Sequence, residues 1–253
     1  METSRSPEMT LSRIGDELRR LKIHDVSSAY QPSLPLLFAM PKAQVRSIDE
    51  RTPEADFGVP AHVWELPEHS GSHVESPSHF VSGGAPIDDL PADVLFFRPF
   101  KKFDISADER RLGEPVSRER LVAAAERSGF ALEAGDVAIV DFGWDRCLPG
   151  GSVGEDGEWW GLNEPGLSAD ACEYLASAGV QAVACDTSVC DLPIRDGQIT
   201  GAAGPSEWLL PNGILIIEGL VGLSAVPPTG MLAALPRKLG KGTSSLRVLL
   251  LTE

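Results

Sequence analysis

The sequence predicts an α/β fold, and three observations support this. Helical and extended segments alternate through the second half of the chain, which is typical of α/β proteins. Several extended segments are short apolar runs of the kind found in buried strands. The first half is rich in proline and in short extended segments, which indicates an additional β-layer. With 253 residues and 42% hydrophobic content, the chain can bury a sizeable core, in one large domain or two small ones.

The first half begins with a predicted amphipathic helix. Leu11, Ile14, Leu18 and Leu21 recur at helical spacing, so we expect a helix over residues 10–22, in a helical N-terminal extension of residues 1–24. We also expect strands at DVSSAY (25–30) and HVWEL (62–66), a long loop with several prolines at 31–60, and an apolar VLFF run in a turn-rich segment at 86–106.

The second half carries sharper signals. Ser117 and Ser168 are predicted to cap helices that Gly129 and Gly179 end, at residues 118–128 and 169–178. A Gly-rich stretch with two tryptophans, residues 147–167, predicts a partly ordered loop. Buried strands are expected at 135–144, 180–186, 213–220 and 245–252.

Charge and composition exclude several classes of protein. With 22 basic and 37 acidic residues the net charge is −15, which argues against nucleic acid as a partner. The sequence has no long apolar run, and residues 1–20 are polar, so we expect neither a membrane span nor a secretory signal. The four cysteines form no CxxC pair, so we expect reduced thiols in a cytoplasmic protein.

Residues 69–80 read HSGSHVESPSHF and contain three of the five histidines of the chain. In an extended chain alternate side chains share one face, so His69, His73, Glu75 and His79 would lie together. Gly71 and Pro77 disfavour a helix here. Imidazole with carboxylate suits zinc, manganese or ferrous iron. The alternative is a surface loop of solvated histidines, or imidazoles hydrogen-bonded at a sheet edge.

A metal site in this stretch requires the chain to bend. The extended path from His69 to Glu75 spans about 20 Å, whereas metal–ligand bonds are about 2 Å long. Gly71 is the expected hinge, because glycine adopts conformations that other residues avoid. Pro77 is expected to turn the chain again and to return His79 toward the ion.

HSGSHVESPSHF resembles the H-x-G-T-H-x-D-x-P-x-H signature of the cyclase-like metal-dependent hydrolases. That family includes bacterial kynurenine formamidase, isatin hydrolase and certain polyketide cyclases. Three later segments resemble the family in the same order along the chain, so the likeness runs from about residue 62 to 228. These segments are GDVAIVDFGW, PGLSADACEYLASAGVQAVACDT and LLPNGILIIEGLVGLSAVPP.

The resemblance implies one α/β domain, residues 1–253, of swivelling β/β/α type, with a mixed β-sheet layer and flanking helices. It implies that His69, His73 and Glu75 bind one divalent ion, zinc or manganese, that Glu218 lies near the metal, and that His79 is catalytic. Glu218 also ends the apolar run Ile214–Ile217, where a carboxylate must be paired, metal-bound or at a pocket mouth, unless it faces water at the strand end. A small-molecule substrate and a homo-oligomer are also implied.

Two departures from the family pattern bear on function. Glu75 replaces the usual aspartate, which keeps the charge but lengthens the side chain. Ser206 stands where the family has a histidine, twelve residues before the glutamate, and no histidine follows His79. These departures argue against a second metal ion and against kynurenine formamidase activity in particular.

Three functions remain open from the sequence. The first is a metal-dependent hydrolase of a small cyclic amide, lactone or formamide, in which His79 moves protons. The second is a cyclase that closes a ring by aldol chemistry and dehydration in polyketide or other natural-product biosynthesis. The third is a ligand-binding protein that has kept the fold without catalysis.

Overall fold

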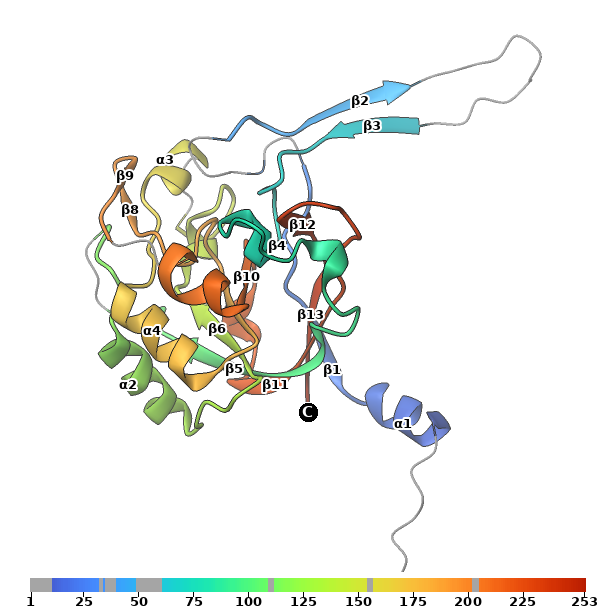
Figure 1. Ribbon diagram of the computed structural model, residues 1–253, viewed down its shortest axis with the longest axis vertical. Coiled ribbons are helices and arrows are strands. Elements are labelled where there is room, and N and C mark those ends of the chain that lie inside the picture. The colour runs from blue at the N-terminus through green and yellow to red at the C-terminus, as the bar shows by residue number, and fades with distance from the viewer. Residues whose placement is uncertain are drawn as a thin grey trace, which may run out of the picture.

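A mixed sheet of nine strands forms the centre of the computed structural model (Figure 1). The structure describes residues 11–31, 34, 40–48, 61–108, 112–153, 157–201 and 205–253. In order across the sheet, the strands are β1 (Lys22–Asp25), β13 (Val248–Thr252), β11 (Thr229–Ala234), β5 (Phe96–Asp104), β6 (Val137–Asp141), β7 (Ala182–Cys185), β10 (Leu215–Glu218), β4 (His73–Glu75) and β12 (Thr243–Ser245).

The four central strands, β5, β6, β7 and β10, run parallel, and the strands on either side of them pair antiparallel. Parallel strands are buried on both faces, and VAIVD of β6 is buried along its whole length. Ala138 and Val140 pack toward the helices, while Val137 and Ile139 pack on the opposite face. The carboxyl ends of the central strands therefore meet at one edge, where α/β sheets place their ligands.

Two helices cover one face of the sheet side by side: α2 (Arg118–Ser128) and α4 (Ala169–Ala178) (Figure 1). Both end at glycines in the left-handed conformation, Gly129 and Gly179, as the sequence predicts. The remaining short helical segments are α1 (Leu11–Leu18), α3 (Gly157–Leu162), 3-10 helices η1 (Pro77–His79), η2 (Ile87–Asp89), η3 (Trp144–Cys147), η5 (Leu210–Asn212) and η6 (Leu223–Ala225), and a π-helical turn, η4 (Pro205–Leu209).

The predicted N-caps stand at the expected positions but act differently. Ser117 and Ser168 precede their helices, yet neither side chain accepts a capping hydrogen bond. The Ser168 hydroxyl instead donates to the Val116 carbonyl at 2.9 Å, and Asp170 accepts the backbone N–H of Arg118 at 3.1 Å. The starts of α2 and α4 are thus fixed to each other rather than capped separately.

On the face of the sheet away from α2 and α4, strands from the two sides of the sheet pack against each other. Val74 of β4 and Val248 of β13 belong to one buried cluster, although five strands lie between theirs in the sheet order. The sheet must therefore curl. The segment after β1 joins the two sides, because Val26 bonds through its backbone both to Val248 and to Val221.

Several predicted elements differ from the structure. The first helix ends at Leu18 and β1 begins at Lys22, so the expected helical end at 22 and the strand at 25–30 are wrong. The register explains this, because residues 22–25 pair with residues 249–252 at the sheet edge. The expected loop at 31–60 contains β2 (Gln44–Ile48), which pairs with β3 (Ala61–Glu65). The expected loop at 147–167 contains α3. The strands expected at 62–66, 135–144, 180–186, 213–220 and 245–252 are present, and their ends lie within three residues of those limits.

The cysteines also depart from expectation. Cys185 and Cys190 form a disulfide, so the expectation of four reduced thiols is wrong for this pair. The loop after β7 turns back and brings their Cα atoms to 5.7 Å, a normal separation for a disulfide. Cys147 and Cys172 are buried.

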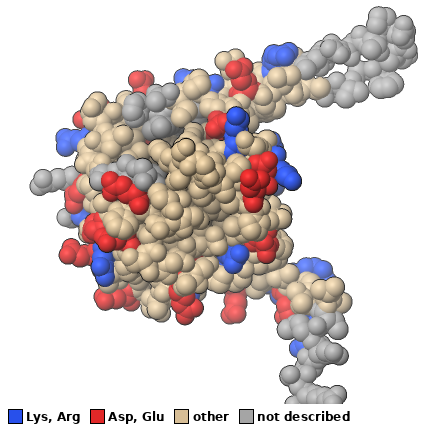
Figure 2. Space-filling view, in the orientation of Figure 1, with Lys and Arg blue, Asp and Glu red and all other residues tan. Residues whose placement is uncertain are grey.

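Two elements project from the body of the molecule, the β2–β3 hairpin and helix α1 (Figure 1). Helix α1 buries none of its residues. Acidic side chains lie around the margins of the face shown in Figure 2, and its centre is formed mostly by uncharged residues. Among the described residues, no helix combines the length and apolar character needed to cross a membrane.

A buried ion pair links β5 to β6. Lys102 is 4% exposed, and its Nζ donates to Asp141 Oδ2 at 3.2 Å and to the Leu223 carbonyl at 2.9 Å. Burial raises the pKa of Asp141, and the Lys102 charge opposes that rise.

We expect Lys102→Met to lower the free energy of unfolding by about 3 kcal/mol at pH 7, because Asp141 loses its counter-ion. Without Lys102 the folded-state pKa of Asp141 rises further above its unfolded value, so the loss should shrink as the pH falls and Asp141 is protonated. Urea denaturation at pH 7 and pH 5 measures both effects. The control is Lys101→Met on the same strand, because Lys101 forms no ion pair with a described residue. An equal loss at both pH values would contradict this account.

Candidate metal centre

The site is built where β4 lies against β10. The register places His73 directly opposite Glu218, and Glu75 opposite Ile216. Because side chains alternate along a strand, His73, Glu75 and Glu218 point to the same face. That is the face that α2 and α4 cover, since Ile216 packs in their cluster. Glu218 ends β10 and is 2% exposed, so it does not face water at the strand end.

The chain bends on both sides of β4, as the sequence predicts. Gly71 has a φ of +60°, which favours glycine, and this turn brings His69 back toward the strand. Pro77 begins the 3-10 helix η1, which returns His79 to the same place. The backbone of Gly219 packs against this bend: a Cβ atom at Gly219, whose φ is +69°, would lie 2.5 Å from the Gly71 carbonyl oxygen.

Four predicted ligands converge. One ligand atom each from His69, His73, Glu75 and Glu218 lies within 4.8 Å of the others. His69 Nδ1 is 3.0 Å from Glu75 Oε1, and His73 Nε2 is 3.1 Å both from His69 Nδ1 and from Glu218 Oε2. Ligand atoms bound at about 2.1 Å to a tetrahedral ion lie about 3.4 Å apart, so these separations suit one ion.

The hydrogen bonds around His73 and Glu218 leave two acceptor atoms facing each other. His73 Nδ1 donates to the Gly71 carbonyl at 2.8 Å, so its Nε2 carries a lone pair when the ring is neutral. That lone pair faces Glu218 Oε2, a buried oxygen that accepts no hydrogen bond from the described residues. Two acceptors facing each other at 3.1 Å repel unless a proton or a metal ion lies between them. The donor set and its geometry therefore fit a divalent ion.

The charges of the cluster agree with this. Burial lowers the pKa of His73, which keeps the imidazole neutral and able to bind metal. Burial and the charge of Glu75 raise the pKa of Glu218 well above its usual range. Burial also acts to raise the pKa of Glu75, but the hydrogen bond from His69 and the charges of the nearby imidazoles lower it on balance. A bound cation would favour the ionised form of both carboxyls.

His79 lies beside the cluster and remains accessible. Its Nε2 is 3.5 Å from Glu75 Oε1, and its side chain is 23% exposed. Burial lowers its pKa, and the charge of Glu75 partly opposes this. Gly242 packs against its backbone, and the Thr243 hydroxyl of β12 lies 3.5 Å from its Nδ1. His79 can therefore exchange protons beside an ion without being buried among its ligands.

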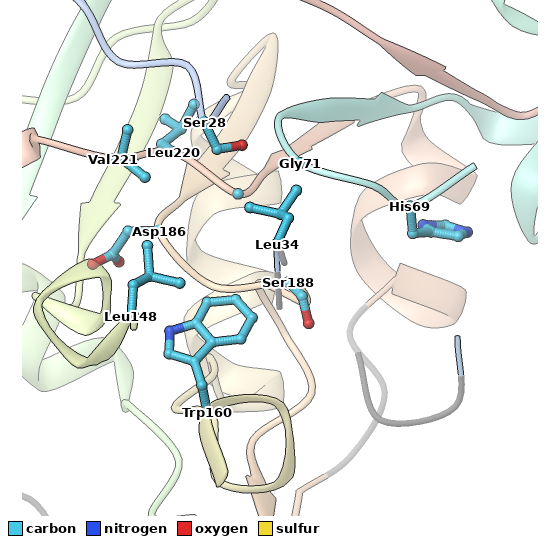
Figure 3. A pocket seen from close by; sticks show the side chains of 11 residues that line it. Ser28, Leu34, His69, Gly71, Leu148, Trp160, Asp186, Ser188, Leu220 and Val221 are labelled. Atoms are coloured by element: carbon cyan, nitrogen blue, oxygen red, sulfur yellow. The ribbon is translucent and has the colours of Figure 1, made fainter. Parts of the chain in front are cut away.

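A cavity adjoins the cluster, and its lining includes His69, Gly71 and Gly219. In Figure 3, Leu34, Leu148 and Trp160 gather in the middle of the view, and His69 lies apart at one side. The lining is mainly apolar, with Asp186 and Ser188 among its polar members. Asp186 accepts hydrogen bonds from backbone N–H groups in the turn after β6. It therefore also holds that turn in place beside the cavity.

Three residues that contribute to the site are not predicted from the sequence. Gly219 supports the Gly71 bend, the Cys190 N–H donates to Glu218 Oε1 at 2.8 Å, and Thr243 adjoins His79. Gly219 is detectable only as part of the EGL segment after the apolar strand. The other two contacts depend on strand pairing across the chain. The side chain of Ser206 lies outside the described residues.

The model of the protein family described as "Putative cyclase" matches residues 23–192. The chain belongs to this family. The match includes HSGSHVESPSHF and the two following motifs, so the resemblance to cyclase-like metal-dependent hydrolases is confirmed. The last segment, at 209–228, lies beyond the matched residues.

Two relatives extend the likeness. The isatin hydrolase of Roseibium aggregatum is 26% identical over 265 residues, which cover 95% of this chain and 95% of that protein. The kynurenine formamidase of Salinibacter ruber is 31% identical over 181 residues, which cover 71% of this chain and 74% of that protein. Both names are those of hydrolases, and the expectation of an enzyme of the cyclase family is confirmed.

Solved structures confirm the fold. A crystal structure of an isatin hydrolase bound to the product analogue thioisatinate has a TM-score of 0.76 at 23% identity, covering 96% of this chain and 97% of that one. Isatin hydrolase A from Ralstonia solanacearum has a TM-score of 0.76 at 21% identity and full coverage of both chains. The predicted single α/β domain, with a mixed sheet and flanking helices, is therefore correct.

We expect Gly219→Ala to lower the free energy of unfolding by about 2–4 kcal/mol, because the new Cβ combines a strained backbone with a clash against Gly71. Gly213→Ala is the matched control. Gly213 has a φ of +74° and nothing within 4 Å of its added Cβ, so only the backbone strain of about 1 kcal/mol applies. Urea denaturation of both variants gives the difference, and equal losses would show that contact with the Gly71 bend is unimportant.

Proposed function

We propose that the protein is a metal-dependent hydrolase that opens a small cyclic amide or cleaves a formamide. The observation that carries this proposal is the convergence of two histidines and two carboxylates beside His79, at the edge of a cavity. The relatives named isatin hydrolase and kynurenine formamidase support the choice of substrate class.

His69, His73, Glu75 and Glu218 would hold one divalent ion, zinc or manganese. A divalent ion supplies a Lewis acid, which lowers the pKa of a bound water to near neutrality and polarises a carbonyl oxygen. The chain itself supplies the orientation, because the Gly71 carbonyl fixes the ring of His73 and the Cys190 N–H fixes Glu218.

His79 would move the protons of the reaction. Its neutral imidazole accepts a proton from the attacking water and then gives it to the leaving nitrogen. Burial lowers its pKa, which favours the neutral form needed for the first step. The ring has one open side, since it is 23% exposed, and Glu75 and Thr243 adjoin its two nitrogens.

The lining of the cavity supports a compact substrate, because an apolar wall with Leu34 and Trp160 suits a small ring system. The relatives named as hydrolases favour hydrolysis over ring closure. Close contact between His69 and Glu75 at 3.0 Å also argues for a working metal site rather than a scaffold.

Protein purified without chelator should contain one divalent ion per chain by elemental analysis. His73→Ala should lose it, because this variant removes the most deeply buried nitrogen ligand. Chelation should abolish hydrolysis of the cyclic amide isatin or of an aromatic formamide, and added zinc or manganese should restore it. Turnover that survives complete metal removal would contradict the proposal.

His79→Ala should lower kcat by about 10²–10⁴-fold while ion content and fold are kept, because only proton transfer is removed. His24→Ala is the control for loss of a histidine, since His24 lies on β1 and contacts Thr252. Steady-state kinetics, elemental analysis and circular dichroism separate the effects. Loss of the ion together with activity would assign His79 to metal binding instead.

We further propose that the protein is a homo-oligomer. The projecting elements expose apolar side chains that a second copy would cover: Trp64 is 47% exposed on β3 and Leu11 is 88% exposed on α1. Light scattering should give a mass of at least twice 27.0 kDa, and Trp64→Ser should shift the protein toward the monomer. A monomer at micromolar concentration would rule out this assembly.

A further inference from the structure

Asp191 is a buried carboxylate that the proposed hydrolysis does not use. It follows the disulfide in the loop after β7 and is 1% exposed. Its Oδ2 accepts no hydrogen bond from any described residue. The preceding residue, Cys190, donates its backbone N–H to Glu218, so the loop holds Asp191 close to a proposed metal ligand. A buried carboxylate oxygen without a partner calls for a compensating positive group.

The neighbours of Asp191 do not provide that positive group. Burial, and then the charges of Glu218 and Glu75, raise the pKa of Asp191 well above its usual range. The basic side chains within ion-pair distance of Glu75 and Glu218 are the imidazoles of His69, His73 and His79. No lysine or arginine among the described residues pairs with these two glutamates or with Asp191, so the buried carboxyls have no permanent cation beside them.

Glu164, which bonds to Ser188 of the loop that holds Asp191, shows how a buried carboxyl is accommodated without a cation. It is fully buried, but its two oxygens accept hydrogen bonds from the backbone N–H and the hydroxyl of Ser188. Burial raises its pKa to about 8, which leaves it largely protonated at neutral pH. Asp191 Oδ2 has no such donor among the described residues, so the loop itself does not explain why an acid stands at this position.

We propose that Asp191 is a third carboxylate of the cation site, and that its charge is balanced by the divalent ion bound at His69, His73, Glu75 and Glu218. The inference rests on the proposed function, because it requires that these four residues bind an ion. Asp191 acts as a positioning residue: it strengthens ion binding through its charge and does not touch the substrate. It would compensate in part for the histidine that Ser206 replaces.

The test compares ion affinity and metal-free stability in Asp191→Asn. We expect the Kd for Mn²⁺, measured from the electron paramagnetic resonance signal of the free ion, to weaken about tenfold or more. The thermal midpoint of the metal-free variant should not fall, because asparagine keeps the shape and removes a buried acid. A lower midpoint with an unchanged Kd would assign Asp191 to the structure of the loop and overturn the inference. If Asp191→Asn does not fold, Asp191→Ser replaces it, with the same expected loss of affinity.

Asp196→Asn is the matched control. It makes the same chemical change five residues further along, on a side chain that is 81% exposed. Its φ is +48°, which asparagine tolerates, so the backbone is not disturbed. We expect its Kd to stay within about twofold of wild type, because solvent screens the charge. An equal loss of Mn²⁺ affinity in both variants would show that only the net charge of the protein matters, and it would overturn the inference.

Wild-type protein separates this inference from the proposed function. If wild type binds Mn²⁺ or Zn²⁺ and Asp191→Asn binds equally well, only the role of Asp191 fails. If wild type binds neither ion, the metal-dependent function fails and the inference fails with it.

Discussion

The pairing of β4 with β10 is the constraint on which the rest of the site depends. β4 has only three residues, yet it lies between β10 and β12 and presents two of its side chains to the site. A shift of one residue in its register would turn His73 and Glu75 to the opposite face and bring Val74 opposite Glu218. The left-handed glycines at 71 and 219, which pack against each other, oppose such a shift.

The local part of this arrangement could be predicted from the sequence. Alternation places His73 and Glu75 on one face, and the short reach of metal–ligand bonds requires a bend, which Gly71 provides. Helices α2 and α4 could be predicted with both ends, because Gly129 and Gly179 adopt the expected left-handed conformation. Strands β6, β7 and β10 could be predicted because each is an apolar run of strand length. These features depend on neighbours within a few residues.

The remaining features depend on partners far along the chain. Strand β11 reads TGMLAA, in which Thr229 is the one β-branched residue and no residue is aromatic, and it exists because β5 and β13 pair with it. Strand β1 is displaced from its predicted place because its position is set by β13. The contact of Cys190 with Glu218, and of Thr243 with His79, likewise depends on how distant loops and strands meet. No periodicity in one stretch encodes such contacts.

Much of the apolar cavity wall and the candidate ion-binding cluster come from different stretches of the chain. The cluster is supplied by residues 69–79 and by the end of β10, whereas Leu34, Leu148 and Trp160 of the cavity wall belong to three other segments. Substitutions in the wall can therefore change which molecule fits without disturbing the ligands. For an evolving lineage this makes substrate choice and chemical mechanism separable traits, so one reaction centre can serve many different metabolites.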